Sequence, residues 1–220
     1  CRIPKESPMS LRSTMYKLLA VCLRIPEASW VEGIRQIDPF KKILQSVSLE
    51  ELQREHTRLF SLTVAGGVPP YETEYGHKDV FFKTQRLADI AGFYRAFGFE
   101  VSDLAHERVD FIGAELELMF WLTLKEETAS QKGRQADANI CKEAATKFMT
   151  DHLGRWGSFF GDSLVRDSHP FYRYLGEQLT QWVESECRRL GAEPERVTGW
   201  EPPPVTASFE CGLDGKECAS

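Results

Sequence analysis

The spacing of hydrophobic residues constrains the fold of this chain more than any other feature, because it follows the period of an α-helix almost throughout. Apolar residues recur at intervals of three and four along most of the 220 positions, as they do on the buried side of an amphipathic helix. No segment alternates with a period of two for long enough to predict a β-strand. The spacing therefore predicts an all-α fold.

Capping residues predict where several of these helices begin and end. Serine can accept a hydrogen bond from a free N–H of the first turn, proline is tolerated in that turn, and glycine favours the left-handed backbone after the last turn. Residues of these types flank the apolar stretches at Ser10, Ser48, Gly98, Pro170 and Gly191. They predict helices over about 10–22, 48–60, 79–97 and 170–190.

A further helix is predicted from position 102 or 103 to about 124. Residues three and four apart share a face of a helix, so Asp110 would point with Glu117, beside Phe111. Clustered carboxylates of this kind can accept bidentate hydrogen bonds from guanidinium groups. The structural alternative is that the acidic residues of this helix are solvated or pair with arginines of the same chain, Arg108 among them.

The chain is long enough for a single large domain with a substantial core. A polar stretch at 125–137 contains Gly133 and predicts a hinge between two packed helical halves. We therefore expect one globular helical domain over 1–200, followed by a tail at 201–220 with three consecutive prolines. Either a monomer or a dimer that exchanges helical halves is compatible with such a hinge.

Composition narrows the class of partner. The formal net charge is −6 and the pI about 5.5, a surface that repels phosphate backbones and attracts basic peptides. No nucleic-acid partner is therefore expected. The sequence shows no apolar run near the ~20 residues of a membrane-spanning helix, and the six cysteines are too scattered for a disulfide framework. Cys22, Cys141 and Cys187 are predicted to be small buried residues, and the protein to be cytoplasmic.

The loop that ends near position 76 is predicted to be stiff, because Pro69 and Pro70 fix their own backbone and force the preceding residues out of helix. Such a loop can present Tyr71 and Glu72 in a fixed arrangement at low entropic cost. Ordinary packing explains the same residues equally well, as a proline-rich connection with half-buried tyrosines. Neither this loop nor the acidic segment near 110 contains a nucleophile with a base, a set of metal ligands or a phosphate-binding glycine loop. The pattern predicts a binder of peptides that are apolar at one end and cationic at the other, and no enzyme.

Four segments also carry a resemblance to a known family. They are a Glu-x-x-x-Leu-Phe element, a Pro-Pro-aromatic-Glu loop, an acidic segment, and a Phe-x-x-x-His-Leu-x-x-Trp-x-x-x-Phe pattern. In order along this chain they comprise Glu55, Leu59 and Phe60, then 69–73, then Asp110, Ile112, Glu115, Leu116, Glu117 and Met119, then Phe148, His152, Leu153, Trp156 and Phe160. Over roughly positions 10–190 they resemble the TorD/DmsD/NarJ family of redox-enzyme maturation chaperones.

The chain departs from the family pattern at three positions. Val109 stands where the family has proline, Phe111 where it has histidine, and Tyr71 where many members have tryptophan. The missing histidine removes a polar contact that the family is thought to use on its ligand or on a bound nucleotide. The groove is therefore expected to be more apolar here, and a nucleotide role less secure.

The resemblance implies a cytoplasmic chaperone dedicated to a molybdopterin oxidoreductase. Such chaperones bind the twin-arginine signal peptide, or another terminal segment, of the catalytic subunit and hold it until cofactor insertion and assembly. Desolvated apolar anchors would supply most of the affinity, and carboxylates would meet the arginines. The candidate residues for apolar contact are Leu59, Phe60, Pro70, Tyr71 and Phe111, and those for the arginines are Glu72 and Asp110.

Two other classes of function compete with this interpretation. A small helical metalloprotein or enzyme could use Glu74 and His77 together with Cys211 and Cys218 of the tail, although two thiolates alone do not complete a tetrahedral zinc site. Guanine-nucleotide hydrolysis is the weaker rival, because the chain has no Walker-type phosphate loop. No cofactor and no metal are therefore expected. His152 is predicted to be a hydrogen-bonded structural residue, since it sits on an apolar helical face.

Overall fold

The computed structural model describes residues 9–60, 67–76, 79–99, 108–166 and 169–199. Within these ranges the chain is built of helices, and its one extended pairing is an isolated antiparallel bridge between Tyr71 and Phe111. The predicted all-α fold is confirmed. No helix among the described residues is long and apolar enough to cross a membrane.

The helices vary from one turn to six. They are α1 (Leu11–Cys22), α2 (Ala28–Ile34), α3 (Phe40–Ile43), α4 (Leu49–Phe60), the 3-10 turn η1 (Glu72–Glu74), α5 (Val80–Ala96), α6 (Ile112–Gln131), α7 (Gln135–Phe148), the π-helical turn η3 (Met149–Leu153), α8 (Gly154–Val165) and α9 (Pro170–Leu190).

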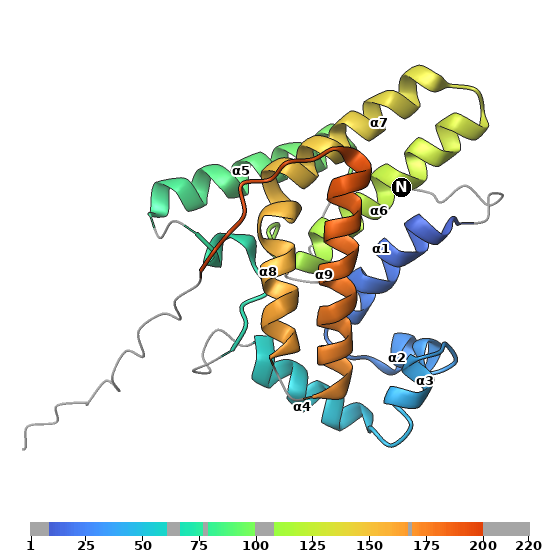
Figure 1. Ribbon diagram of the computed structural model, residues 1–220, viewed down its shortest axis with the longest axis vertical. Coiled ribbons are helices and arrows are strands. Elements are labelled where there is room, and N and C mark those ends of the chain that lie inside the picture. Colours follow the sequence, from blue (N-terminus) through green and yellow to red (C-terminus); the bar gives the residue numbers. More distant parts are fainter. Residues whose placement is uncertain (1–8, 61–66, 77–78, 100–107, 167–168, 200–220) are drawn as a thin grey trace, which may run out of the picture.

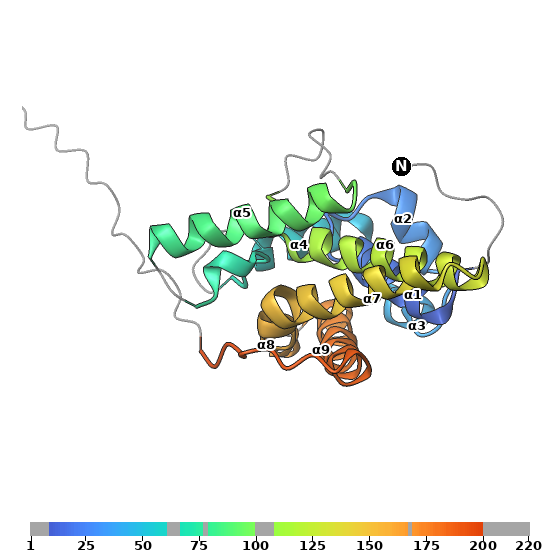
Figure 2. The same cartoon turned by 90° about the horizontal axis from the view of Figure 1, so that it is seen from above.

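The helices form two layers. Antiparallel α8 and α9 lie side by side at the centre of Figure 1, with α4 across one of their ends. Seen from above in Figure 2, α5, α6 and α4 occupy a layer on one side of this pair, and α7 leads from α6 down to α8. The extended residues 192–199 then pass the start of α8, where the Val197 N–H donates to the Arg155 carbonyl at 2.9 Å. This return places the last described residues beside the start of α8.

The predicted caps are present. Ser10 accepts a hydrogen bond from the Ser13 N–H at 3.1 Å, and Ser48 accepts one from the Glu51 N–H at the same distance. Gly98 and Gly191 follow α5 and α9 with positive φ angles of 64° and 67°. These glycines adopt a backbone that other residues rarely adopt, and so the helix ends predicted at these positions are confirmed.

The predicted start of the acidic helix is wrong. Helix α6 begins at Ile112, and residues 108–111 form a turn followed by extended backbone. Asp110 therefore does not share a helical face with Glu117. The turn is favoured because the Asp110 backbone carbonyl accepts a hydrogen bond from the Glu72 N–H at 2.9 Å, and the Ile112 N–H donates to the Pro70 carbonyl at 2.9 Å. Positions 102 and 103 lie outside the described residues.

The predicted end of the same helix is also wrong, because α6 continues past Leu124 to Gln131. Most of the predicted hinge at 125–137 is consequently helical. The connection itself consists of 132–134, with Gly133 in the left-handed region at φ 70°, and it turns the chain so that α7 packs back on α6. The residues after position 199, which include most of the predicted tail, lie outside the described part of the chain.

The core lies between the two layers and contains a cluster of aromatic rings. Trp156, Phe160 and Tyr172 are fully buried on α8 and α9. Phe60 at the end of α4 stacks on Phe160, with ring centroids 6.0 Å apart, and meets Tyr172 edge-on at 5.6 Å. Such ring pairs add to the apolar area that each side chain buries.

Helices α8 and α9 approach each other through glycine. A methyl group added at Gly176 would lie 2.5 Å from the Gly161 carbonyl oxygen, and one at Gly161 would lie 2.8 Å from the Gly176 oxygen. No side chain fits between backbones this close. The crossing therefore requires glycine on both helices.

Candidate functional site

The two segments that the sequence singled out lie against each other. Tyr71 and Phe111 form the isolated β-bridge, and backbone hydrogen bonds join Glu72 to Asp110 and Ile112 to Pro70. Residues about forty positions apart in the sequence are thus neighbours. The structure brings five of the seven predicted site residues together here.

Asp110 is fully buried, and both of its carboxylate oxygens accept hydrogen bonds. One of its oxygens accepts hydrogen bonds from the Thr73 N–H at 3.1 Å and the Thr73 hydroxyl at 2.8 Å. Arg108 donates to both oxygens, at 3.0 and 2.9 Å, and its guanidinium lies 4.3 Å from the centre of the Tyr71 ring. Asp110 therefore ties the two segments together and does not face solvent.

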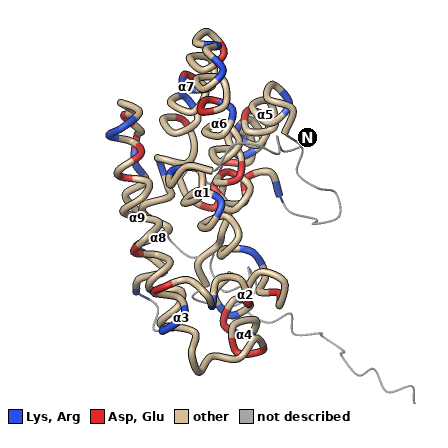
Figure 3. The backbone as a smooth tube through the Cα atoms, turned by 90° about the vertical axis from the view of Figure 1, so that its right-hand side faces the viewer, with Lys and Arg blue, Asp and Glu red and all other residues tan. Residues whose placement is uncertain are grey.

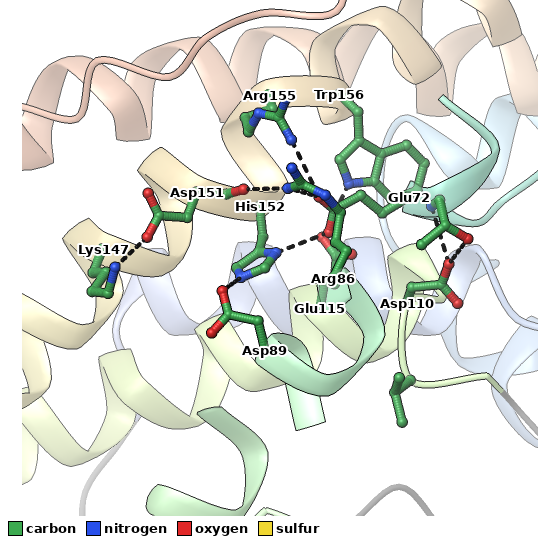
Figure 4. A network of polar contacts seen from close by, with 12 residues as sticks. Glu72, Arg86, Asp89, Asp110, Glu115, Lys147, Asp151, His152, Arg155 and Trp156 are labelled. Carbon is green, nitrogen blue, oxygen red and sulfur yellow. Dashed lines mark hydrogen bonds and ion pairs between the residues drawn. The ribbon is translucent and has the colours of Figure 1, made fainter. Parts of the chain in front are cut away.

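Glu72 is the centre of a second charged cluster (Figure 4). Its side chain is 2% exposed; one oxygen accepts from Arg86 at 2.7 Å and the other lies 3.0 Å from Nδ1 of His152. Arg155 approaches the first oxygen at 3.8 Å. Arg86 also donates to the Asp151 carbonyl at 2.8 Å, which ties α5 to η3. Two arginines from different helices thus converge on one buried carboxylate.

A third carboxyl group, Glu115 of α6, lies behind Glu72. It is completely buried, and the Trp156 indole N–H donates to it at 3.2 Å. Burial, reinforced by the negative charge of Glu72, raises the pKa of Glu115 well above its usual range. Glu115 therefore keeps its proton to a higher pH than a solvated glutamic acid does.

His152 connects this interior to the surface. It is 1% exposed, and while Nδ1 lies against Glu72, Nε2 lies 3.2 Å from a carboxylate oxygen of Asp89, whose side chain is 58% exposed. The predicted buried, hydrogen-bonded histidine is confirmed. It belongs to the π-helical turn η3, and turns of this type are frequent at functional sites.

The π-helical turn depends on the glycine that follows it. A methyl group at Gly154 would lie 2.3 Å from the Met149 carbonyl oxygen and 3.1 Å from the Cys187 sulfur. The wider turn lets His152 and Trp156 both point into the protein. Local winding of the helix therefore positions the histidine over Glu72.

A cleft of about 860 Å³ opens on the outer side of this cluster. It lies between α5, the turn η3 with the start of α8, and the returning segment after α9. Its lining includes four carboxylates, two half-buried arginines, the edge of His152 and an aromatic ring; these residues are Asp89, Asp151, Glu193, Glu195, Arg86, Arg155, His152 and Phe82. Elsewhere acidic and basic residues are interspersed along the helices (Figure 3). The gathering of carboxylates around the cleft suits a cationic ligand.

None of the seven predicted site residues lines this cleft. Leu59 and Phe60 are 1% and 7% exposed and belong to the core, because α4 turns its apolar side onto α8 and α9. Pro70 and Phe111 are buried in the paired segments, Glu72 and Asp110 are buried and paired with internal arginines, and Tyr71 is half-buried under Arg108. The structural alternative considered for the loop and the acidic residues therefore describes their positions. These residues lie in the interior behind the cleft and do not form its surface.

The residues that do line the cleft were missed. A usable signal was present in the spacing of Arg86 and Asp89 on α5, and of Asp151 and Arg155 across η3, where ionisable side chains border apolar helical stripes. Such side chains lie at the edge of a core, where helices meet solvent. Which edges come together depends on the packing of α5 against the end of α7 and η3, and no local sequence pattern predicts that packing.

The competing metal site is not visible in the described part of the chain. Among those residues no group of three or more histidine, cysteine or acidic side chains could hold a metal ion. His77, Cys211 and Cys218, on which that alternative depended, lie outside the described residues. Cys22, Cys141 and Cys187 are buried free thiols, as predicted.

Comparison with known proteins points in one direction. The family described as "Nitrate reductase delta subunit" matches residues 27–161, which include α5, η3 and the start of α8. The chain is 26% identical over 192 residues to the chlorate reductase assembly chaperone protein of Ideonella dechloratans, covering 87% of this chain and 95% of that protein. It is 33% identical over 111 residues to the selenate reductase assembly chaperone protein of Thauera selenatis, covering 50% and 56%. Both relatives are named as chaperones and neither as a catalyst.

Proposed function

Because this chain belongs to the nitrate reductase delta subunit family, a family of redox-enzyme maturation chaperones, we propose that it assists the assembly of a redox enzyme by binding a segment of its catalytic subunit. The chain is a chaperone and not an enzyme. Its work is reversible binding, and no cofactor of its own is part of the proposal.

The segment that we propose is the twin-arginine signal peptide, or an equivalent terminal stretch, of a molybdopterin oxidoreductase. The chaperone would hold this segment in the cytoplasm until the cofactor is inserted and the subunits assemble. The relatives named for chlorate and selenate reductases support a reductase client. The acidic pI of about 5.5 supports a basic segment of that client.

The observation that carries the proposal is the set of four carboxylates that line the cleft and outnumber its two arginines. Asp89, which contacts His152, has a side chain that is 58% exposed, and that of Asp151, which pairs with Lys147, is 35% exposed. Glu193 and Glu195 stand exposed on the opposite rim. A guanidinium can form charge-assisted, bidentate hydrogen bonds with carboxylates placed in this way. Two arginines next to each other would find partners on both rims.

The buried carboxylates have a supporting role in this proposal. Glu72 holds Arg86, Arg155 and His152 in place behind the cleft. Asp110 keeps the loop that carries Glu72 fixed to the start of α6. The arginines of the ligand would pair with the exposed carboxylates of the cleft. The buried carboxylates would hold the elements that carry these residues in fixed positions.

The test is calorimetric titration with a synthetic peptide that carries an arginine pair, and with the same peptide carrying two glutamines. We expect wild-type protein to bind the arginine peptide more tightly. The double variant Asp89→Asn/Asp151→Asn should lose at least about tenfold in affinity, which corresponds to ~1.4 kcal/mol. The control is Glu143→Gln, an exposed acid of α7 away from the cleft lining.

Circular dichroism would verify that all variants keep their helices. Equal affinity of wild type for both peptides would contradict arginine recognition. An unchanged affinity of the double variant would remove the cleft from the site while leaving the chaperone role intact.

A further inference from the structure

Helix α5 begins with three consecutive hydrophobic residues that are exposed. Val80 is 76% exposed, Phe81 is 74% exposed and Phe82 is 54% exposed. The two phenylalanine rings lie edge to face, with centroids 6.4 Å apart. No two of the other large exposed hydrophobic residues of the described chain, which are Met9, Leu11, Ile25, Ile37 and Ile140, are adjacent in the sequence. A single exposed apolar residue is ordinary, but three in succession form a patch.

Within the described residues, the contacts that anchor α5 in the fold lie further along the helix than this patch. The helix is anchored by Ile90 and Tyr94, which are 0% and 3% exposed, and Asp79 already caps its start by accepting a hydrogen bond from the Phe81 N–H at 2.7 Å. Valine and phenylalanine are poorer helix formers than alanine, lysine or glutamate. Their presence on an exposed first turn is therefore explained better by binding than by stability.

The patch is continuous with the acidic cleft. Phe82 is one of the residues that line the cleft, and Ala88 and Asp89, one to two turns further along α5, line it as well. An apolar surface and one of the cleft carboxylates thus share one helix. Together they complement a ligand that carries positive charge at one point and apolar side chains nearby.

We propose that Val80, Phe81 and Phe82 form an apolar subsite for the stretch of client peptide that adjoins its arginine pair. This inference rests on the proposed function and adds a second, separable half to the site. The arginines lie against the carboxylates of the cleft, and the apolar side chains of the same peptide lie on the first turn of α5.

The geometry of α5 sets the spacing between the two halves. Phe82 and Asp89 are seven positions apart, which corresponds to about 10 Å along a helix that rises 1.5 Å per residue. An extended peptide advances about 3.3 Å per residue. The first apolar contact is therefore expected roughly three positions along the peptide from the arginines.

The experiment uses the full chain and two peptides that contain an arginine pair in a glycine-serine background. In one peptide a Leu-Phe pair follows the arginines directly, and in the other the pair begins three positions after the second arginine. Binding is measured for wild type, for Phe81→Ser, for Phe81→Ser/Phe82→Ser, and for the control Ile140→Ser, an exposed residue of α7 at 55%. Phe81→Ser alone guards against a loss of fold at the less exposed Phe82.

We expect the spaced peptide to bind wild type about tenfold more tightly than the unspaced one. Both phenylalanine variants should remove this advantage, and Ile140→Ser should keep it. A wild-type protein that binds neither peptide would overturn the proposed function and the subsite with it. Binding of both peptides that is insensitive to Phe81→Ser would overturn the subsite alone. Light scattering supplies a further check. If wild type is a dimer, the phenylalanine variants are monomers and all bind the peptide with the same affinity, then the patch serves self-association and the proposal is overturned.

Discussion

Asp110 accepts hydrogen bonds from three donor groups while being completely buried. Thr73 and Arg108 occupy both of its oxygens, and its backbone carbonyl holds the Glu72 N–H. A buried carboxylate is stable only when it is paired and hydrogen-bonded in this way. The residue is therefore the joint between the proline loop and α6.

Asp110→Ala should lower the free energy of unfolding by about 3 kcal/mol, because it leaves Thr73 and the half-exposed Arg108 without their partner. Asp89→Ala, which removes an exposed carboxylate, should cost less than about 1 kcal/mol. Urea denaturation of the two variants measures the difference. Comparable midpoints for both would show that Asp110 has no structural role.

His56 gives the fold a pH dependence. It is half-buried beside Phe60, with Nε2 3.3 Å from the Leu23 carbonyl oxygen. Burial lowers its pKa to about 4, whereas in the unfolded chain the pKa is about 6.5. Between these values the unfolded state binds the proton and the folded state does not, so the free energy of unfolding decreases as the pH falls from about 6.5 to about 4.

His56→Gln removes this contribution. The stability difference between wild type and variant should narrow by up to about 3 kcal/mol as the pH falls through that window, and stay constant above and below it. Chemical denaturation at a series of pH values gives the two curves. Parallel curves would show that His56 titrates alike in both states.

The sequence indicated which residues matter near positions 72 and 110 but not where their side chains point. An acidic residue beside an apolar helical stripe gives the same sequence pattern whether its carboxylate faces solvent or an internal arginine. Glu72 and Asp110 were predicted to face a ligand. Glu72 is instead paired with Arg86 of α5, and Asp110 is held by the neighbouring Arg108 and by Thr73 of the proline loop. That distinction arises from tertiary packing, which no local pattern encodes.

At the scale of helices, the strongly patterned elements were predictable. Helices α1, α4, α5 and α9 have apolar stripes and caps at the positions expected. Helices α2 and α3 are too short, at seven and four residues, to show a period. The extension of α6 beyond Leu124 was missed because its last residues are polar, although lysine, glutamate and glutamine favour helix. Amphipathic spacing detects large apolar side chains on a buried face, and this half-buried helical end, apart from Ala129, has none.

Gly176→Ala should destabilise the protein by about 1–3 kcal/mol, because the added methyl group would press α9 away from the Gly161 carbonyl. Gly92→Ala in α5 is the matched control. A methyl group there meets nothing within 4 Å, so this change should be neutral or stabilising by up to about 1 kcal/mol. Thermal unfolding of both variants decides the point, and a Gly176→Ala protein as stable as wild type would show that the helix crossing is not tight.

On the scale of the whole molecule, one short connection joins the two predicted helical halves. Residues 132–134 reverse the direction between α6 and α7, and Gly133 supplies the left-handed turn. Helices α7, α8 and α9 all follow this connection. Of the elements after it, α7 and η3 contact α6. The packing of the halves thus depends on three residues.

Deleting 132–134 should convert monomers into dimers that exchange α7, α8 and α9. Without the turn, α6 and α7 join into one helix, and the second half can reach its packing surface only on another copy. Multi-angle light scattering at several concentrations measures the mass, and circular dichroism checks the helix content. A monomer with native helix content would exclude exchange by this route.

The π-helical turn has a consequence for comparing relatives. Removing one residue between Met149 and Leu153 would restore ordinary winding and rotate everything before that point by about 100° relative to α8. His152 would then no longer lie over Glu72, and α7 would present a different stripe to the rest of the protein. A gap of one residue at this place in an alignment would therefore indicate a chaperone whose cleft is lined by different side chains. Sequence identity in the rest of the alignment would not reveal this difference.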